Sequence, residues 1–374
     1  MTVGIVGAGQ LGRMMALAGY PLGLDFLFLD PAADSPAGQV APQLQQAFTD
    51  PAALQQLATA AEVLTIDWEN ISVPALKALT QGQGKRKGRG TRVCPPVAAI
   101  AAAQDRVSEK KLFGKLGIPT TRWQAVDSLK DLQRATQAIG LPGVLKTRRM
   151  GYDGKGQFVL RGAQDIEPAW AALGTAPLLY EEMVPFDSEV SVIGARSTRG
   201  ETAVYPLNHN FHHGGILRLT RAPHGSPALQ RLAGGYIDRV LGHFRYTGIL
   251  TIEFFVRKGR LIANEMAPRV HNSGHWTIEG AQTSQFENHL RAILGLPLGS
   301  TRAVGHSAMI NLIGTMPDRG RVLAHPGLHL HDYGKDPRPG RKLGHLTLVE
   351  ASAVARDRRS RSLMAELVPG TPIP

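Results

Sequence analysis

The sequence predicts an α/β protein of about two or three domains, and three observations carry this prediction. The length of 374 residues is more than one typical domain needs for its core. The chain begins as a buried strand, a glycine turn, a helix and a second strand, the order found in doubly wound parallel sheets. Residues 251–256 and 261–266 are apolar segments on either side of a glycine-containing turn, which indicates a β-hairpin.

Composition limits the class of protein further. Hydrophobic residues make up 43% of the chain and charged residues 19%, which is typical of a globular protein. The one cysteine, Cys94, excludes an internal disulfide and fits a reducing, cytoplasmic compartment. The N-terminus lacks the cationic segment of a signal peptide. No apolar run approaches the roughly 18 residues of a membrane span, so we expect no membrane partner.

The formal net charge of +12 raises the question of a nucleic-acid partner. Two basic runs, at residues 85–89 and 356–361, are far apart in the sequence, and the other arginines are scattered. Aromatic residues that could stack on bases are scarce near both runs. We therefore expect a solvated surface, or attraction of small anions, and no nucleic acid. A basic nucleic-acid-binding module remains an alternative.

The N-terminal segment contains a glycine fingerprint. A strand at residues 3–6 is followed by the turn Gly7-Ala8-Gly9-Gln10-Leu11-Gly12, a helix over 13–18 and a strand over 25–29 that ends at Asp30. This order, with an acid about 20 residues after the turn, matches dinucleotide-binding domains. The same turn also serves doubly wound folds that hold no cofactor. An NAD-dependent dehydrogenase is therefore an alternative function at this stage.

The next elements connect this segment to the middle of the chain. Residues 62–70 predict a strand that runs into acids, and ligands of open parallel sheets bind beyond such strand ends. Glu69 is therefore a candidate site residue, although it could instead be a carboxylate stabilised by a helix N-terminus. A basic, glycine-rich connection over about 82–96 precedes a predicted helix over 98–116, for which Gly117 is placed as a C-cap.

A second glycine-rich segment, Lys146 to Gln157, has the sequence KTRRMGYDGKGQ. Its three glycines allow backbone N–H groups to approach an anion, and its four cationic side chains add positive charge. The spacing differs from a Walker A loop. We predict a flexible lid over a polyphosphate. The alternative is a glycine-rich hairpin turn whose charges are solvated.

Strands are predicted over 178–184 and 189–195, and a histidine cluster follows. Zinc could use His209 together with His212 or His213, but no cysteine lies nearby and the adjacent glycines suggest a mobile loop. A loop histidine close to a ligand is the favoured interpretation.

The hairpin contains the most informative pair of residues. Glu253 and Glu265 each lie six positions from Gly259, so a hairpin folded about this glycine places them opposite each other on one face. Facing like charges destabilise a sheet unless a cation lies between them. Mg²⁺ prefers carboxylate and phosphate oxygens. Two solvated surface glutamates are the alternative, but their apolar neighbours favour the metal.

Polar residues follow the hairpin directly. Arg269 could hold a small anion in a bidentate fork, with His271 and Asn272 close by. Residues 333–345 form a second cationic loop, rich in glycine and proline, that suits a single phosphate group. A solvated run of charges is the alternative for this loop.

Taken together, a glycine-rich lid, a downstream acidic strand and paired carboxylates resemble the ATP-grasp superfamily. The motifs at residues 9–14, 151–157, 264–269, 271–276 and 338–342 are similar to those of 5-(carboxyamino)imidazole ribonucleotide synthases. The resemblance runs from Gly4 to about residue 350. It implies an N-terminal Rossmann-like domain over 1–100, an ATP-grasp region over 101–300 and a C-terminal domain over 301–374. A small lid lobe would occupy about 120–184.

The resemblance also implies an activity. The family carboxylates 5-aminoimidazole ribonucleotide with ATP and bicarbonate, through carboxyphosphate, and releases ADP and phosphate during purine biosynthesis. Mg²⁺, or Mn²⁺ in its place, would be the cofactor, and a cytoplasmic homodimer would be the assembly. Another ATP-grasp ligase that acts on a different amine or carboxylate is the alternative within the superfamily.

The family roles transfer to this sequence residue by residue. The ATP-binding residues would be Arg106, Lys146, Gly151, Tyr152, Asp153, Gly154, Lys155, Gly156, Gln157, Glu181, Glu182, Met183, Val184, Glu189, His212, Asn264 and Glu265. The ribonucleotide would bind to Glu69, Tyr152, Lys155, Asn272, Lys335, Arg341 and Lys342. Glu253 and Glu265 would bind the metal. Catalysis would involve Asp153, Arg269, His271 and Lys335, with Asp153 taking the proton from the amine. The chain departs from the family pattern at Lys155, where arginine is frequent, and at Met150, where glycine is frequent.

Overall fold

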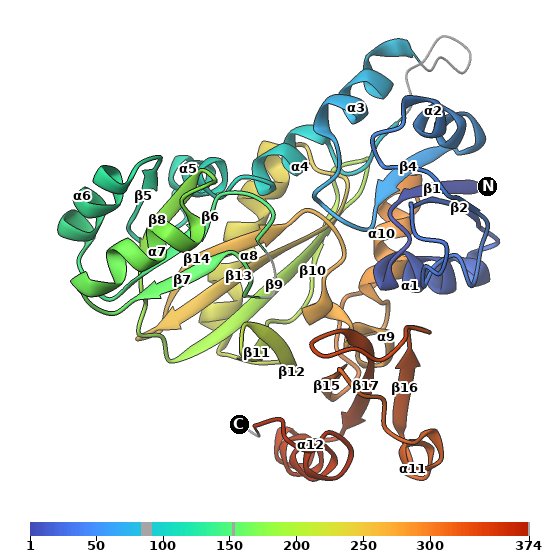
Figure 1. Ribbon diagram of the computed structural model, residues 1–374. Coiled ribbons are helices and arrows are strands. Elements are labelled where there is room, and N and C mark those ends of the chain that lie inside the picture. The colour runs from blue at the N-terminus through green and yellow to red at the C-terminus, as the bar shows by residue number, and fades with distance from the viewer. Residues whose placement is uncertain (84–91, 152–153, 373–374) are drawn as a thin grey trace.

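The computed structural model describes residues 1–83, 92–151 and 154–372. These residues form three sheets with helices packed around them. In Figure 1 the lid lobe lies at the left, the N-terminal domain at the upper right and the C-terminal segment at the bottom, around a long central sheet. None of the helices in the described part of the chain is both long enough and apolar enough to cross a membrane.

The N-terminal domain is a parallel sheet, as the fingerprint predicts. The strand order is β3-β2-β1-β4, and all three pairings are parallel. Its elements are β1 (Thr2–Val6), α1 (Gln10–Gly19), η1 (Tyr20–Leu22), β2 (Asp25–Leu29), β3 (Gln43–Leu44), α2 (Pro51–Ala60), β4 (Val63–Ile66), α3 (Val73–Ala78) and η2 (Leu79–Gln83). The carboxyl ends of β1, β2 and β4 therefore meet at one edge of the sheet. Residues 84–91 of the predicted basic connection lie outside the described residues.

The single helix expected over 98–116 is wrong. The structure has two helices, α4 (Val97–Ala103) and α5 (Arg106–Lys115), and Asp105 lies between them. The Asp105 carboxylate accepts hydrogen bonds from the backbone N–H groups of Val107 and Ser108, which makes it the N-cap of α5. Gly117 follows the helix with φ +64°, as a C-terminal glycine should.

The lid lobe is an antiparallel sheet of order β5-β8-β6-β7, with two helices packed on it. Its elements are β5 (Trp123–Val126), α6 (Leu129–Ile139), β6 (Gly143–Thr147), β7 (Gln157–Leu160), η3 (Ala163–Asp165), α7 (Ile166–Leu173) and β8 (Leu178–Glu182). Apolar residues of α6, β6 and β8, including Leu132, Leu145 and Tyr180, make its core. The glycine-rich segment connects β6 to β7 at the edge of this sheet.

The central sheet has nine strands and is antiparallel throughout. Its order is β14-β13-β9-β11-β12-β15-β17-β16, with β10 paired to β9, so the C-terminal strands extend the same sheet. The strands are β9 (Ser188–Arg196), β10 (Thr202–Val204), β11 (Asn208–His213), β12 (Ile216–Ala222), β13 (Gly248–Arg257), β14 (Arg260–Ala267), β15 (His306–Ile313), β16 (Leu328–Asp332) and β17 (Lys342–Glu350). The helices are α8 (Pro227–His243), η4 (Asn272–Gly274), α9 (Thr277–Gly280), α10 (Gln285–Leu294), α11 (Arg319–Leu323) and α12 (Ala353–Leu367).

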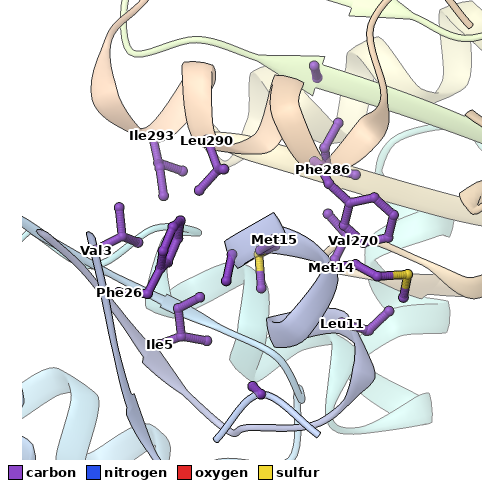
Figure 2. Packing of buried hydrophobic residues seen from close by; sticks show 14 of the residues in the cluster. Val3, Ile5, Leu11, Met14, Met15, Phe26, Val270, Phe286, Leu290 and Ile293 are labelled. Carbon is purple, nitrogen blue, oxygen red and sulfur yellow. The ribbon is translucent and has the colours of Figure 1, made fainter. Parts of the chain in front are cut away.

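A shared hydrophobic core joins the N-terminal domain to the central sheet. Figure 2 shows Leu11, Met14 and Met15 of α1 between the first strands and the helix α10, which contributes Phe286 and Leu290. Val270 also belongs to this cluster and is fully buried. Because Val270 is anchored, its neighbours in sequence, Arg269 and His271, have fixed positions beside the N-terminal domain.

Candidate active site

Two cavities adjoin each other at the centre of the molecule. The smaller, of about 320 Å³, lies between the lid lobe and the central sheet. The larger, of about 640 Å³, is lined by the N-terminal domain, the base of the lid segment and the end of β14. Both cavities are lined by Arg106, Glu265, His271, Asn272 and Lys342. A ligand in one cavity can therefore approach a ligand in the other across this wall of charged and polar groups.

The predicted pairing of Glu253 with Glu265 across the hairpin is confirmed, but the turn and the strand register that produce it differ from the prediction. Lys258 and Gly259, with φ of 50° and 72°, form the two-residue turn, and Phe254 pairs with Ala263. Continued without change, this register would pair Glu253 with Asn264. A β-bulge at this point shifts the register by one residue, so Glu253 pairs with Glu265. The bulge thereby moves Glu265 from the core face of β14 to the cavity face.

The two carboxylates have different electrostatic surroundings. Burial raises the pKa of Glu253 to about 7; nearby His212 opposes this shift, and Glu265 adds to it. Burial also acts to raise the pKa of Glu265, but the cations Arg106 and Lys146 outweigh it and hold that pKa below its usual range. Arg106 donates to Glu265 Oε2 at 3.0 Å.

This arrangement fits a divalent cation that completes its coordination with phosphate oxygens. Two facing, partly buried carboxylates are the protein ligands that Mg²⁺ typically uses at such sites. Asn264 Oδ1, beside Glu265, is buried without a hydrogen-bond partner. Within the described residues no group of three or more histidine, cysteine or acidic side chains could hold a metal by itself.

Lys146 and Glu181 line the smaller cavity, and the buried Lys110 joins their ion-pair network. Glu181 binds both Lys146, in a short ion pair, and Lys110, at 3.1 Å. Thr121 donates a third hydrogen bond to Glu181 at 2.7 Å. Burial alone would raise the pKa of Glu181, but the two lysines hold it far below its ordinary value. Sequence reasoning chose Lys146 and Glu181 and missed Lys110, which a helical position i+4 from Arg106 could have suggested.

The segment after β8 gives the smaller cavity an apolar slot. Glu182, Met183 and Val184, all predicted to bind ATP, line this cavity. The predicted strand over 178–184 ends at Glu182, so Met183 and Val184 belong to the connection to β9. The apolar walls are completed by Val144, Val159, Phe186, Leu217 and Phe255.

The histidine cluster is part of strand β11, so the expected mobile loop is wrong. His212 lines the smaller cavity, and its Nδ1 lies 2.9 Å from Glu189 Oε2. Burial acts to lower the pKa of His212, but its bonding to Glu189 and the nearby Glu253 raise this pKa to about 8. His209 instead stacks on His224, with ring centroids 4.8 Å apart. The bond to Glu189 and the nearby Glu253 therefore favour the cationic form of His212.

Two carboxylates of the protein itself accept the backbone N–H groups of the first glycine turn. Asp67, at the end of β4, accepts a short hydrogen bond from the backbone N–H of Gly9, and Asp30 accepts one from Ala8 at 2.8 Å. Burial raises the pKa of Asp67 to about 6, against the lowering effects of the Gly9 N–H and of Arg269. These carboxylates lie where a dinucleotide pyrophosphate would bind, so the geometry opposes the dehydrogenase alternative.

The larger cavity contains a second buried carboxylate that sequence reasoning missed. Glu109 lines this cavity and accepts the backbone N–H of Met266 at 2.6 Å. Burial raises its pKa to about 8, and the nearby Glu265 adds to that shift. The predicted residue Glu69 also lines the cavity, in a short ion pair with Arg269. Asn272 lines both cavities, and both polar atoms of its side chain are buried without a partner.

The lid segment contributes to both cavities. Gly154, Lys155 and Gln157 line the smaller one, and Gly151 lines the larger. Gly156 adopts φ +70°, and its backbone oxygen accepts the N–H of Thr147 at 2.8 Å. The predicted residues Tyr152 and Asp153 lie outside the described residues.

The base of the lid segment is tied to α5. Arg148 and Arg149 form ion pairs with Asp105, at 2.8 and 3.4 Å. The residue that breaks the helix therefore also anchors the lid segment. Met150, which follows, has φ +62°, a conformation in which a glycine would be unstrained.

The cationic side chains of the second cationic loop, residues 333–345, do not all lie in one place relative to the cavities. Lys342 lines both cavities, and Lys335 Nζ donates to Gln10 Oε1 at 2.5 Å. Lys335 also lies over the buried ring of Tyr333, 5.6 Å from its centroid. Arg341 Nη1 donates to the backbone oxygen of Asp336 at 3.1 Å. The loop thus approaches the first glycine turn and the larger cavity.

Comparison with known proteins agrees with this geometry. Family models match a ribonucleotide synthetase preATP-grasp domain at residues 1–104, an ATP-grasp domain at 111–286 and a phosphoribosylaminoimidazole carboxylase C-terminal domain at 307–359. N5-carboxyaminoimidazole ribonucleotide synthase from Pseudomonas aeruginosa is 50% identical over 348 residues, which covers 93% of this chain and 94% of that protein. The chain belongs to the N5-carboxyaminoimidazole ribonucleotide synthase family.

Solved structures of the N5-carboxyaminoimidazole ribonucleotide synthase family have the same fold. The enzyme from Thermus thermophilus matches with a TM-score of 0.91 and 48% identity, and the match covers 98% of each chain. The enzyme from Aspergillus clavatus, solved with ADP and 5-aminoimidazole ribonucleotide, matches with a TM-score of 0.89 and 30% identity over 97% of each chain. The chain is therefore an ATP-grasp ligase, and the reaction of its family is the ATP-dependent carboxylation of 5-aminoimidazole ribonucleotide.

Proposed function

We propose that the smaller cavity binds ATP, the larger cavity binds 5-aminoimidazole ribonucleotide, and carboxyl transfer takes place across the wall between them. The observation that carries this assignment is that Arg106, Glu265, His271, Asn272 and Lys342 line both cavities. When both reactants are bound and oriented on either side of such a wall, they react without first having to meet in solution. The product is 5-(carboxyamino)imidazole ribonucleotide.

The smaller cavity suits each part of ATP. Its apolar slot would hold the adenine, with the backbone of residues 181–184 at the base edge and Glu189 at the ribose. Lys146 and Arg106 would contact the phosphates, and Gly151 to Gln157 would cover them. His212 and Asn264 line the same cavity. Excluding water protects a labile intermediate, which is the reason for a lid.

Mg²⁺, or Mn²⁺ in its place, would bind to Glu253 and Glu265. A divalent cation there supplies positive charge to the terminal phosphates and offsets the negative charge that develops during phosphoryl transfer. The raised pKa of Glu253 is consistent with a carboxyl group that needs a cation to ionise fully at neutral pH. Arg106 balances the second carboxylate.

Bicarbonate would be activated at the wall. One of its oxygens attacks the γ-phosphorus, the bond to ADP breaks, and carboxyphosphate forms. The amine of the ribonucleotide then attacks the carboxyl carbon, phosphate leaves, and the amine loses a proton. Arg269, His271 and Asn272 would orient the anionic groups. Asp153, outside the described residues, remains our candidate for taking the proton.

The ribonucleotide would lie in the larger cavity with its phosphate toward the second cationic loop. Lys335, Arg341 and Lys342 would bind the phosphate, with Lys335 also contributing to catalysis. Glu69, Tyr152 and Lys155 would contact the rest of the nucleotide. Glu69 is already oriented by Arg269. A cytoplasmic homodimer is part of this proposal and rests on family membership alone.

The test is the release of phosphate from ATP, measured with and without 5-aminoimidazole ribonucleotide and bicarbonate. We expect release to require both, to stop when EDTA removes divalent cations, and to recover when Mg²⁺ is added. Release that ignores both co-substrates would favour another ATP-grasp ligase. Sedimentation of the purified protein at several concentrations tests the homodimer.

A further inference from the structure

His271 stands where the two cavities meet, and hydrogen bonds hold its ring on one side. It lines both cavities, and its side chain is 15% exposed. The residue lies between β14 and the short helix η4, for which it is the N-cap. Its protonation state and orientation therefore bear directly on any anion that lies at the wall.

The contacts of Nδ1 determine which ring nitrogen carries the proton. The backbone N–H of Ser273 points at His271 Nδ1 from 3.3 Å, and the Ser273 hydroxyl lies 2.9 Å from the same atom. A backbone N–H can only donate, so Nδ1 must be an acceptor. In a neutral imidazole with an accepting Nδ1, the proton is on Nε2. In a doubly protonated ring, the Nδ1–H would point at the backbone N–H of Ser273, and two donors would face each other without an acceptor.

The other ring nitrogen faces the carboxylate pair. His271 Nε2 lies 3.7 Å from Glu253 Oε1, which is too long for a hydrogen bond. This N–H is thus directed at the junction of the cavities, where an oxygen of an anionic ligand can accept it.

Buried side chains fix the backbone that carries this ring. Gln285 accepts the backbone N–H of His271 at 3.0 Å and donates to its carbonyl oxygen at 2.7 Å. Gln285 is fully buried, and its own backbone N–H donates to Thr277 Oγ1 at 3.0 Å. The carbonyl of Ser273 accepts from Asn208 at 2.8 Å. The ring therefore has little freedom to exchange its two nitrogens.

We infer that His271 serves as a neutral Nε2–H donor to an anionic oxygen at the junction, and that Ser273 and Gln285 are the positioning residues that fix this tautomer. The inference rests on the proposed function for the identity of the anion, a bicarbonate or carboxyphosphate oxygen. A neutral imidazole donor of this kind stabilises developing negative charge. It cannot accept a proton at Nε2, so the proton lost by the amine must go to another group.

The first experiment measures the tautomer directly. Nitrogen-15 NMR of protein labelled at histidine, with the His271 signals assigned by their loss in His271→Gln, should show a protonated Nε2 and an unprotonated Nδ1. A proton on Nδ1 would overturn the inference. Because this measurement needs no turnover, it stands even if phosphate release proves independent of the ribonucleotide, which would instead contradict the proposed function.

The second experiment separates a donor from a base. His271→Gln keeps a neutral N–H donor, whereas His271→Met keeps similar size without one. If His271 is a donor, Met should lower kcat by about 10²- to 10³-fold, the usual cost of one lost oxyanion donor, and Gln should restore at least about tenfold of that loss. Equal activity of the two variants would contradict the donor role.

The third experiment tests the positioning residue Ser273. Ser273→Ala removes the hydroxyl and leaves the backbone N–H, so a minor Nδ1–H population should appear in the spectrum and kcat should fall, with the KM for ATP unchanged. Ser360→Ala is the matched control, because Ser360 is equally buried but bonds within α12 to Asp357. A spectrum of Ser273→Ala identical to that of the control would refute the positioning role.

Discussion

The chain contains two glycine-rich turns that are similar in sequence but differ in the charged groups and cavities that surround them. In the first, at residues 7–12, the N–H groups of Ala8 and Gly9 bond to Asp30 and Asp67. In the second, at residues 151–156, Gly151 lines the larger cavity, and Gly154 and Lys155 line the smaller one. The acids of the fold itself neutralise the first turn, whereas the described residues of the second turn line the two cavities.

The difference shows that a glycine spacing indicates a backbone shape and not a ligand. Glycine allows the close approach in both turns, but the neighbouring charges decide what approaches. At the first turn the carboxyl ends of β2 and β4 supply acids. At the second turn the nearest strand supplies Lys146, and the facing hairpin supplies Glu253 and Glu265 for a cation. The following four predictions test this contrast.

The largest effect should come from the carboxylates that face the second turn. Glu265→Gln should lower kcat by about 10³-fold or more, because a neutral amide neither binds Mg²⁺ well nor balances Arg106. The measurement is phosphate release over a range of Mg²⁺ concentrations. Glu366→Gln, an exchange in an exposed ion pair with Arg321 away from both cavities, is the control and should change kcat by less than about tenfold. Wild-type turnover by Glu265→Gln would refute the metal pair.

The next effect concerns the acid at the first turn and depends on pH. The pKa of Asp67 is about 6 in the fold, above its ordinary value of 3.8. The folded state therefore binds more protons, so the resulting stabilisation is complete below about pH 4 and is lost as the pH rises through 6. Relative to Asp67→Asn, the wild-type free energy of unfolding should fall by up to about 3 kcal/mol over this range.

Urea denaturation of wild type and Asp67→Asn at several pH values between 4 and 7 measures this difference. If the difference in unfolding free energy between the two proteins does not change with pH, the pKa of Asp67 is not raised in the fold. In neither protein should NAD shift the unfolding midpoint. Stabilisation of Asp67→Asn by NAD would break the contrast between the two turns, since it would mean that only one charge keeps the dinucleotide away.

A matched pair of substitutions compares the turns directly. Gly7 has φ +98°, and an added Cβ would lie 2.9 Å from the Cβ of Asp67, so Gly7→Ala should cost about 2 kcal/mol of stability. Gly154 has φ +78° and faces Gly214 and Gly215. Gly154→Ala should mainly raise the KM for ATP, with less change in the unfolding midpoint. The reverse pattern in thermal unfolding and kinetics would overturn the comparison.

The smallest effect should come from the second cationic loop, which approaches the first glycine turn through Lys335. Lys335 contacts Gln10 and lies over Tyr333, whose hydroxyl is 2.8 Å from His345 Nδ1. Loss of the ring in Tyr333→Leu should raise the KM for the ribonucleotide about tenfold, which lies between the values of an exposed and a desolvated cation–π contact. Tyr333→Phe keeps the ring and should change the KM less. An equal effect on the nucleoside that lacks the phosphate would argue against a role in phosphate binding.

Particular residues show how far the sequence could lead. The parallel N-terminal sheet and the hairpin followed from apolar segments and glycine turns, because local patterns determine them. The Glu253–Glu265 pair was found by symmetry about Gly259, but the true turn and the β-bulge that compensates for it are not visible in local sequence. The break at Asp105 could have been recognised, since an Asp before a helical run is an N-cap signal.

Other features depend on contacts between distant residues and could not have been read from local pattern. Glu109 and Lys110 look like exposed helix charges in the sequence, yet both are buried because they bond to Met266 and Glu181. The capture of Gly9 by Asp67 spans 58 positions. The signal that could have found it is the shared edge of β1 and β4, where strand ends in a parallel sheet converge.

The bulge at Glu253 and Asn264 sets a rule for how this hairpin can vary in length. Inserting or deleting one residue between the two glutamates would turn one carboxylate into the hydrophobic interior, whereas a change of two would keep both in the cavity. Homologous hairpins should therefore differ by even numbers of residues here, or carry a compensating irregularity. The same rule tells an engineer which loop grafts this ligase can accept.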